Sequence, residues 1–419
     1  MTYLLYNLVS TLASAPGALW LRAHPRYHPL LARFHPIVPD GIGSSPMWIH
    51  ACSVGEVGTA RPILNAMRRR WPDMPVLLTV STISGFALAQ EVCCEFPVTW
   101  FPFDLKRSVR GFVRQIKPRA LVLIETEIWP NVLRETRRFG APVVLLNGRI
   151  SDKHFDRCLR FRAFFRPIVA QISAAGMQNA EYAQRLIQLG AHPSTVHVTG
   201  NTKFDGVTTE TDPERRARLR QENGFPPDAP ILIFGSTRPG DEVLAAACWK
   251  VLRERFPDLH LIVAPRHMDR LDEALASFDE PVRRRTEVRD GRRPEGERVF
   301  VLDTVGELVA FYALATVAVI GGSFYPGVNG HNPLEPAALG VPTVFGLYMR
   351  NFIDPARELL THEGAIQVAR PEDLLPVLAR LLDDPAARLR IASQGRNAVL
   401  ANQGTIDNSL NLLETVLPR

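Results

Sequence analysis

The chain has 419 residues, 46% of them hydrophobic, which is the usual length of two domains and provides enough apolar side chains for two cores. Its five cysteines lack the C-x-x-C spacing of zinc sites and fit reduced thiols, and its eleven histidines are scattered without ligand spacing. We therefore expect no structural zinc site and no metal ligands.

Charge is distributed unevenly along the chain. The net charge is +6, but residues 1–208 carry 24 Lys and Arg against 13 Asp and Glu, whereas the remainder carries 25 against 30. This asymmetry indicates that only the first half faces an anionic partner, such as a membrane, a phosphorylated substrate or nucleic acid. Nucleic acid is the weakest of these, because no RNA- or DNA-binding motif accompanies the charge. Chance drift between the halves is the alternative.

The first 21 residues contain no charged side chain, and Arg22, Arg26 and Arg33 follow them. The segment lacks the positive n-region of a secretory signal, and its polar residues dilute it as a membrane span. We expect residues 1–40 to be a membrane-associating segment, a shallow anchor whose basic residues meet anionic headgroups on the cytoplasmic side. A buried N-terminal helix of a soluble protein is the alternative.

From residue 47 onward, short apolar runs alternate with helical periodicity, which predicts βαβ units and a mostly parallel sheet. In a first domain, residues 41–208, the strand candidates are 48–51, 76–80, 98–101, 120–124, 143–146 and 196–199. In a second domain, residues 209–419, they are 231–235, 259–264, 299–302, 317–320 and 343–345. The polar stretch 200–228 is interpreted as the linker, the charge-rich stretch 283–298 as a loop, and 371–417 as closing helices. The predicted fold class is α/β, two Rossmann-like domains that face a central ligand cleft.

The motif SVGE at 53–56 follows the first predicted strand. Glu56 falls in the first turn of the next helix, where the helix dipole favours a carboxylate that can accept a proton from a substrate hydroxyl. Ser53 followed by Glu56 also fits the S-x-x-E capping box, a purely structural device. The motif alone does not separate the two interpretations.

A second group of polar residues follows other strands of the first domain. Two carboxylates, Glu125 and Glu127, lie close together in the motif ETEIWPN at 125–131. Placing two negative charges in one turn costs free energy unless a cation or hydrogen-bond donors face them. Lys203, in GNTKFD at 200–205, is placed to face Glu125 or a phosphate, and Asn147 ends the intervening strand. All of them fall at carboxyl ends of strands in one sheet, which predicts that they converge.

Polar turns follow the strands of the second domain in the same way. Arg266, in PRH at 265–267, is the best candidate for a phosphate clamp, because a guanidinium bonds phosphate oxygens in pairs. The turn 304–306 offers backbone groups to a base or ribose. Four such turns facing one crevice predict a nucleotide site.

A glycine loop, 321–322, follows a further strand and leads to a helix start at Asn332 and Pro333. Glycine lets backbone approach a ligand closely, and the free N–H groups of a helix start attract anions. Glu335 lies in the first turn, where it is a good acceptor for ribose hydroxyls. A strand–turn–helix connection with no ligand is the alternative.

Taken together, these motifs resemble the family of 3-deoxy-D-manno-octulosonic acid (Kdo) transferases of lipopolysaccharide synthesis. The resemblance covers nearly the whole chain. It is carried by the uncharged N-terminus, SVGE at 53–56, ETEIWPN at 125–131, NGRIS at 147–151, GNTKFD at 200–205, PRH at 265–267, DTVGEL at 303–308 and GHNPLEPAALG at 330–340. Several long motifs in one order make it specific.

The resemblance implies a B-type glycosyltransferase fold, CMP-Kdo as donor with no cofactor, and the lipid A precursor as acceptor at the cytoplasmic face of the inner membrane. It implies Glu56 as the general base, with Glu125 and Lys203 supporting the transition state. Attack from the face opposite CMP would invert the configuration at the sugar. The residues it implies for CMP binding are Arg266, His267, Thr304, Val305, Gly306, Asn332, Pro333, Leu334 and Glu335.

Two positions depart from the family pattern: Asn329-Gly330 stands where the family has Gly-Gly, and Val305 where it often has Met. Both change the expected fit around the nucleotide without removing a polar partner. The rival functions are a sugar-nucleotide epimerase, which needs no membrane anchor, and a non-catalytic nucleotide sensor, which has no use for Glu56. A dinucleotide oxidoreductase is disfavoured because no G-x-G-x-x-G follows a strand.

Overall fold

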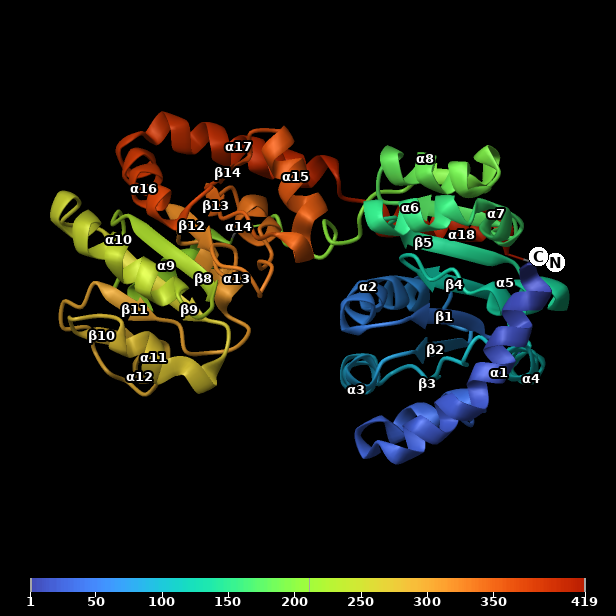
Figure 1. Cartoon of the computed structure of the whole chain (residues 1–419). Coiled ribbons are helices and arrows are strands. Elements are labelled where there is room, and N and C mark those ends of the chain that lie inside the picture. The colour runs from blue at the N-terminus through green and yellow to red at the C-terminus, as the bar shows by residue number, and fades with distance from the viewer. Residues whose placement is uncertain (1, 211, 418–419) are drawn as a thin grey trace. The chain divides into compact units, whose positions relative to one another are not determined.

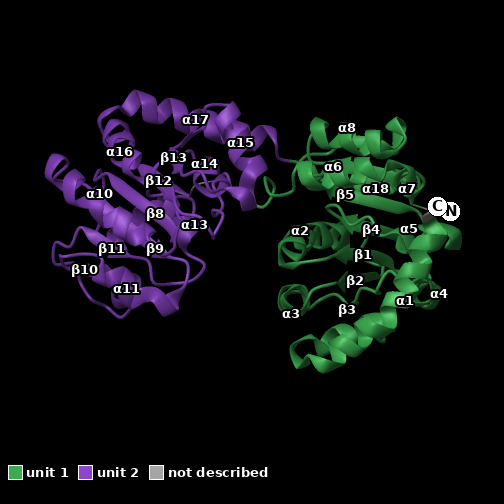
Figure 2. Cartoon of the chain, in the orientation of Figure 1, with its two compact units in different colours: residues 1–206, 404–419 green, residues 207–403 purple. Residues whose placement is uncertain are grey.

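The structure is a computed structural model that describes residues 2–210 and 212–417, and it divides into two compact units (Figures 1 and 2). Unit 1 is Met1–Gly206 with Gly404–Arg419, and unit 2 is Val207–Gln403. The division falls two residues from the predicted boundary at 208. The predicted first segment, 1–40, lies in unit 1. The C-terminal helix α18 (Thr405–Val416) also lies in unit 1, so its prediction as part of the second domain is wrong.

Unit 1 is built on seven parallel strands in the order β3-β2-β1-β4-β5-β6-β7. The strands are β1 (Met47–Ala51), β2 (Val76–Val80), β3 (Val98–Trp100), β4 (Ala120–Ile124), β5 (Val143–Gly148), β6 (Ala174–Met177) and β7 (Val196–Val198). The helices between them are α2 (Val54–Arg70), α3 (Ile83–Val92), α4 (Lys106–Ile116), α5 (Pro130–Phe139), α6 (Asp152–Arg160), α7 (Arg162–Val169) and α8 (Ala180–Leu189). A short 3-10 turn, η2 (Pro193–Thr195), precedes β7.

The central strands of unit 1 are buried on both faces, and this explains their continuous apolar sequences. All five residues of β1, β2 and β4 are buried. One core contains apolar side chains of α4, α5, α7 and α8, and the other contains those of α2, α3 and α18. The C-terminal helix therefore completes the layer that covers one face of the first sheet.

Unit 2 repeats the design with seven parallel strands in the order β10-β11-β9-β8-β12-β13-β14. They are β8 (Ile231–Thr237), β9 (His260–Pro265), β10 (Val282–Arg284), β11 (Val299–Val301), β12 (Val317–Ile320), β13 (Thr343–Phe345) and β14 (Ala365–Gln367). The α-helices are α9 (Pro213–Glu222), α10 (Asp241–Arg255), α11 (Leu271–Ala276), α12 (Arg285–Arg289), α13 (Leu308–Tyr312), α14 (Leu334–Ala338), α15 (Ile353–Thr361), α16 (Leu374–Asp383) and α17 (Pro385–Ala401). Three 3-10 turns accompany them: η3 (Met268–Arg270), η4 (Arg350–Phe352) and η5 (Pro371–Asp373).

The two Rossmann-like sheets confirm the predicted α/β fold class, but some local predictions were wrong. The strands β6, β10 and β14 were missed, because they are short and lack a clear apolar run. The predicted linker contains α9, and the stretch interpreted as a charged loop contains α12 and most of β10. Arg283 of β10 is only 1% exposed and lies over the rings of Phe225 and Phe300, so a charge-rich sequence was mistaken for a solvent-exposed one.

The N-terminal helix α1 (Thr2–Ala23) leads into the 3-10 segment η1 (Pro25–Phe34). Its residues Tyr3–Ala23 are long and apolar enough to cross a membrane by length and composition, and almost none of that stretch is buried. The polar groups of Tyr3 and Tyr6 hold the helix to unit 1, through Asn131 and Asp104. The alternative of a buried helix is therefore wrong, since the apolar side chains point to solvent.

In a doubly wound sheet, ligands bind beyond the carboxyl ends of the strands at the point where the strand order reverses. In unit 1 this point lies between β1 and β4, and in unit 2 between β8 and β12. The segments that follow β1, β4 and β12 carry half of the residues predicted for a site, and the other half follow β7, β9 and β11. The topology thus places one candidate half-site in each unit.

Candidate active site

Glu56 lies in the first turn of α2, directly after β1, and its carboxylate ties the start of that helix. Its Oε2 accepts the Cys52 backbone N–H at 2.7 Å, and its Oε1 accepts the Ser53 hydroxyl at 3.2 Å. A full capping box would also need the Ser53 side chain to accept a backbone N–H of α2, and it makes no such bond. The carboxylate also binds the N–H of Cys52 and not that of the N-cap residue Ser53, so neither bond of a capping box is present, and Glu56 faces other acidic groups as well.

The electrostatic surroundings of Glu56 differ from those expected at a helix start. Burial is the largest influence and raises its pKa to about 8, and the neighbouring carboxylates of Glu127 and Glu125 act in the same direction. The hydrogen bonds from Cys52 and Ser53 oppose the change but do not cancel it. The expectation that the helix dipole would keep the carboxylate charged was therefore wrong, because burial and like charges outweigh it.

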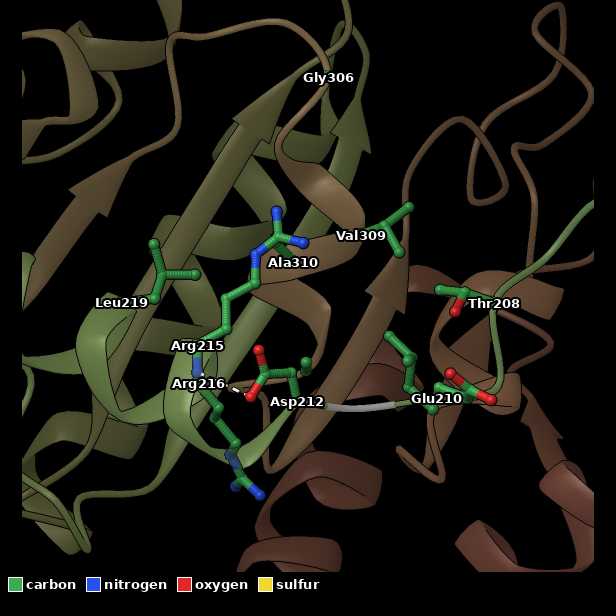
Figure 3. Close-up of a pocket in the computed structure, with 11 residues that line it drawn as sticks. Thr208, Glu210, Asp212, Arg215, Arg216, Leu219, Gly306, Val309 and Ala310 are labelled. Carbon is green, nitrogen blue, oxygen red and sulfur yellow. Dashed lines mark hydrogen bonds between the residues drawn. The ribbon is translucent and has the colours of Figure 1, made fainter.

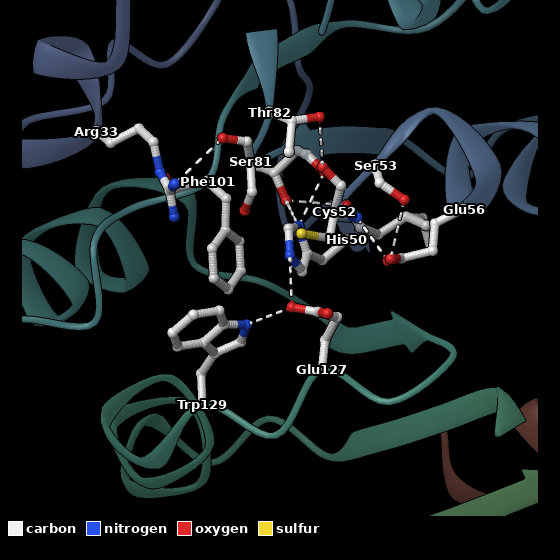
Figure 4. A network of polar contacts seen from close by, with 12 residues as sticks. Arg33, His50, Cys52, Ser53, Glu56, Ser81, Thr82, Phe101, Glu127 and Trp129 are labelled. Carbon is white, nitrogen blue, oxygen red and sulfur yellow. Dashed lines mark hydrogen bonds and ion pairs between the residues drawn. The ribbon is translucent and has the colours of Figure 1, made fainter. Parts of the chain in front are cut away.

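Glu127 connects Glu56 to residues that sequence analysis did not identify. Its Oε2 accepts the indole N–H of Trp129 at 2.6 Å and lies 3.8 Å from Nε2 of the fully buried His50 (Figure 4). Arg33 donates to the carbonyl oxygens of Phe101 and Ser81 at 2.9 and 3.1 Å, and its positive charge interacts with Glu127. His50 was missed because it lies inside a buried strand, where histidine usually has a packing role.

Backbone strain marks the carboxyl ends of three strands. Glu125, Asn147 and Ser236 have φ values of 60°, 55° and 56°, a left-handed conformation that residues other than glycine seldom adopt. The carboxamide oxygen of Asn147 accepts the Thr202 N–H at 3.1 Å, which ties the turn carrying Lys203 to the end of β5. The carboxylates of Glu125 and Glu56 are close enough to interact electrostatically. Lys203 lies on a turn that is anchored to the same edge of the sheet.

The half-site of unit 2 is a basic group at the ends of β8 and β9. Arg238 donates from Nε to Nε2 of His331 at 3.3 Å, and the charges of Arg266 and Arg270 both act on Arg238. Burial, with the nearby Arg238, Arg266 and His267, lowers the pKa of His331 to about 4. Arg270 pairs with Glu242 and Glu273 at 3.4 and 3.0 Å, and Asp241 also acts on Arg238. The mutual repulsion of Arg238 and Arg266 would be relieved by a phosphate or carboxylate at this edge. Sequence analysis selected Arg266 and His267 but neither Arg238 nor His331.

The motif at 332–335 forms a tight helix start. Asn332 accepts the Leu334 N–H at 3.1 Å and donates to Glu335 at 3.2 Å, while Pro333 and Leu334 are buried. Burial raises the pKa of Glu335, and Asn332 and Arg266 oppose that shift. The helix that follows, α14, has only five residues, so its dipole contributes less than a long helix would. The charge of Arg266 nevertheless acts on Glu335, so these two residues of the predicted nucleotide site lie near each other.

The turn at 304–306 is held from behind by Glu307. Thr304 donates to Glu307, which also accepts two N–H groups of Arg285 at 3.0 and 3.2 Å and pairs with Arg289 at 3.1 Å. Burial raises the pKa of Glu307, but these bonds outweigh it and lower the pKa to about 2. Val305 is 86% exposed and Gly306 has a φ of 87°, so the turn presents backbone outward on a rigid base.

Unit 2 also contains a cavity of about 510 Å³ beside the start of α9 (Figure 3). Arg215 and Arg216 line it opposite Val309 and Ala310, and Asp212 caps α9 by accepting the Arg215 N–H at 3.1 Å. Among the residues predicted to bind the nucleotide, only Gly306 lines this cavity. Its size is typical of small-molecule pockets.

The chain is similar to known proteins over nearly its whole length. Residues 26–206 match the family model described as 3-deoxy-D-manno-octulosonic-acid transferase. A 3-deoxy-D-manno-octulosonic acid transferase of Rickettsia felis is 32% identical, with 89% of this chain and 80% of that protein covered. The chain belongs to this family. The transferase of Haemophilus influenzae is 29% identical, with 94% of this chain and 93% of that protein covered.

Solved structures confirm the two-domain glycosyltransferase fold of this Kdo transferase family member. Anabaena HepE in complex with UDP aligns with a TM-score of 0.56, 16% identity and coverage of 88% of this chain and 99% of that one. A glycosyltransferase from Rickettsia africae aligns with a TM-score of 0.58, 9% identity and coverage of 90% and 100%. Membership of the family confirms the resemblance found in the sequence and makes the chain a glycosyltransferase, which removes the epimerase and sensor alternatives.

Proposed function

We propose that this glycosyltransferase moves Kdo from CMP-Kdo to the lipid A precursor lipid IVA, with inversion at the sugar. The observation that carries the proposal is the position of Glu56. It lies at the strand-order reversal of unit 1, beside Glu125 and Glu127, and remains partly exposed. In the proposed reaction the ionised form of Glu56 takes the proton of the lipid's primary hydroxyl while that oxygen attacks the anomeric carbon, and a pKa of about 8 is near the value that suits a general base close to neutral pH.

The basic edge of unit 2 supports the donor half of the proposal. As the bond to CMP breaks, negative charge grows on the phosphate, and in this proposal Arg266 stabilises it. Arg238 and His331 add donors at the same edge. Thr304, Val305 and Gly306 offer backbone groups to the base or ribose, with Glu335 as acceptor for ribose hydroxyls. In unit 1, Glu125 and Lys203 are the further residues that the proposal assigns to support of the transition state.

The N-terminal helix supports a lipid acceptor. The exposed face of α1 includes Leu4, Leu8 and Leu12, which are 75%, 57% and 67% exposed. Apolar side chains on a docked helix are expected to enter the acyl region of a membrane, with Arg22 and Arg26 among the headgroups. We therefore place the protein at the cytoplasmic face of the inner membrane, where a lipid substrate can reach Glu56.

A reaction of the purified full-length protein with CMP-Kdo and lipid IVA in mixed micelles tests this function. The expected result is a lipid whose mass rises by whole Kdo units, with one CMP released for each sugar added. Mass spectrometry counts both products. Release of CMP without sugar on the lipid, or no reaction at all, would contradict the proposed substrates.

A further inference from the structure

Three potential ligand atoms meet at the half-site of unit 1. The Cys52 Sγ, one carboxylate oxygen of Glu56 and one of Glu127 all lie within 4.8 Å of one another. We call these three residues the Cys52 cluster. They come from the end of β1, the first turn of α2 and the β4–α5 turn, so their spacing in the sequence gives no metal motif. An acidic cluster alone is common on proteins, and a second observation is needed to assign it a ligand.

His50 supplies that observation, because its Nε2 is buried and has no hydrogen-bond partner among the described residues. Its Nδ1 lies 3.0 Å from the carbonyl oxygen of Thr79. A carbonyl only accepts, so Nδ1 carries the proton and Nε2 of the neutral ring presents a lone pair. That lone pair faces the Glu127 Oε2 at 3.8 Å, and two acceptors then face each other without a proton or cation between them.

The ring of His50 is fixed in this orientation before any ligand arrives. It stacks on Phe101 with ring centres 3.5 Å apart and an angle of 16° between planes. Histidines that bind metals usually donate one ring N–H to a backbone carbonyl or carboxylate and bind the metal through the other ring nitrogen. His50 has this arrangement. Figure 4 shows His50, Cys52 and Glu127 pointing toward one another.

We propose that the Cys52 cluster and His50 form a binding site for one soft divalent cation of the zinc class. Sulfur, imidazole nitrogen and two carboxylate oxygens make a four-ligand set that suits Zn²⁺ rather than Mg²⁺ or Ca²⁺. Atoms that share a tetrahedral zinc lie roughly 3.3–3.7 Å apart, because bonds of roughly 2.0–2.3 Å meet near the tetrahedral angle. The three atoms of the Cys52 cluster lie within 4.8 Å of one another and the His50 Nε2 lies 3.8 Å from the Glu127 Oε2, so the site closes around a cation when side-chain rotations shorten these separations.

The positive charge of Arg33 does not prevent cation binding. Its hydrogen bonds go to the carbonyl oxygens of Phe101 and Ser81 and not to the carboxylates of the Cys52 cluster. Those carboxylates already accept the Cys52 N–H, the Ser53 hydroxyl and the Trp129 indole N–H, so the cation takes the lone pairs that remain on their oxygens. Zinc replaces the thiol proton of Cys52 and the proton that Glu56 carries when its raised pKa leaves it neutral, and both protons leave to solvent. Bound zinc also occupies Glu56, so the cation inhibits transfer by competing with the acceptor hydroxyl. This consequence rests on the proposed function, whereas binding does not.

Cobalt titration of the chelator-treated full-length protein in detergent tests the site directly. Thiolate-bound Co²⁺ gives a near-ultraviolet charge-transfer band, which we expect to saturate at one equivalent in the wild type and to vanish in Cys52→Ala. Cys94→Ala is the matched control, because that thiol is exposed and free, and it should keep the band. X-ray absorption of the zinc-loaded wild type should show one sulfur at about 2.3 Å with lighter ligands at about 2.0–2.1 Å. A missing band, a band that persists in Cys52→Ala or a sulfur-free shell would overturn the site.

Transfer assays separate this site from the proposed function. Zn²⁺ should inhibit the wild type reversibly, and Cys52→Ala should raise the inhibitory concentration by about tenfold or more, the usual scale for weakening a metal site. If the wild type shows the cobalt band but Zn²⁺ does not inhibit its transfer reaction, the inhibitory role of the site is wrong. If Glu56 were not the base, Glu56→Gln would stay active while the wild type kept its cobalt band, so the two failures are distinguishable.

Discussion

Asp104 offers a sharp test of how the first turn of α5 is held. Its carboxylate uses both oxygens: Oδ2 accepts the Tyr6 hydroxyl at 2.7 Å and the Asn131 N–H at 3.0 Å, and Oδ1 accepts the Val132 N–H at 2.9 Å. Burial raises the pKa of Asp104 in spite of these bonds. The negative charge is therefore not what stabilises the fold, and replacing it with a neutral group costs little in itself.

The substitution Asp104→Asn separates charge from geometry, because an amide has only one acceptor oxygen. The favourable orientation keeps that oxygen on Tyr6 and Asn131, which leaves the buried Val132 N–H facing the amide nitrogen. An unsatisfied buried N–H costs about 1–3 kcal/mol. Each 1.36 kcal/mol is a factor of ten, so opening of that amide should increase by roughly 5–150-fold.

Hydrogen exchange resolved to single amides measures this effect. We expect faster exchange at Val132 and nearly unchanged protection at Asn131. The exposed Asp73→Asn is the matched control and should change neither amide. Unchanged exchange at Val132 would refute the reasoning, and so would a loss of protection at Asn131 alone, since it would mean that the opposite orientation is favoured.

Three further predictions test other parts of the account. Glu307→Gln should lower the free energy of unfolding, measured by chemical denaturation, by about 1.5–3 kcal/mol at pH 7. Because folding lowers the pKa of Glu307 to about 2, the stability that its charge provides is lost in acid, and the difference from wild type should shrink as the pH falls below about 4.3. Gly235→Ala would place a methyl group 1.9 Å from the Tyr312 hydroxyl and should lower the melting temperature by the equivalent of about 1–3 kcal/mol, whereas Gly111→Ala in the open face of α4 should raise it slightly. Leu8→Glu should weaken binding to anionic vesicles, measured by flotation, by about tenfold or more, because it removes roughly 1.5–3 kcal/mol of apolar burial in lipid. Unchanged flotation would show that α1 does not anchor the protein.

The sequence was most informative where burial and local geometry agree. Runs such as Val76–Val80 and Val317–Ile320 were predicted to the residue, because a strand covered on both faces must be apolar throughout. β6 and β10 were missed for the opposite reason. β6 is made of small residues, and β10 contains Arg283, whose burial depends on two distant aromatic rings.

The candidate site could be predicted only in part. Glu56 and Glu125 were found because they follow strands, and the topology then places them at the strand-order reversal. His50 could not be found this way, since its role depends on the Thr79 carbonyl of a neighbouring strand. The pKa of Glu56 was equally out of reach, because Glu127 and burial set it, and both are properties of the folded chain.

The central claim is that Glu56 is the general base, and the transfer rate of Glu56→Gln tests it most directly. The account predicts that transfer from CMP-Kdo falls by about 10²–10⁴-fold while CMP affinity is unchanged. Glu91→Gln, on the exposed surface of α3, should keep the wild-type rate. A Glu56→Gln enzyme that transfers Kdo at the wild-type rate would contradict the account and leave that side chain only its bonds to Cys52 and Ser53.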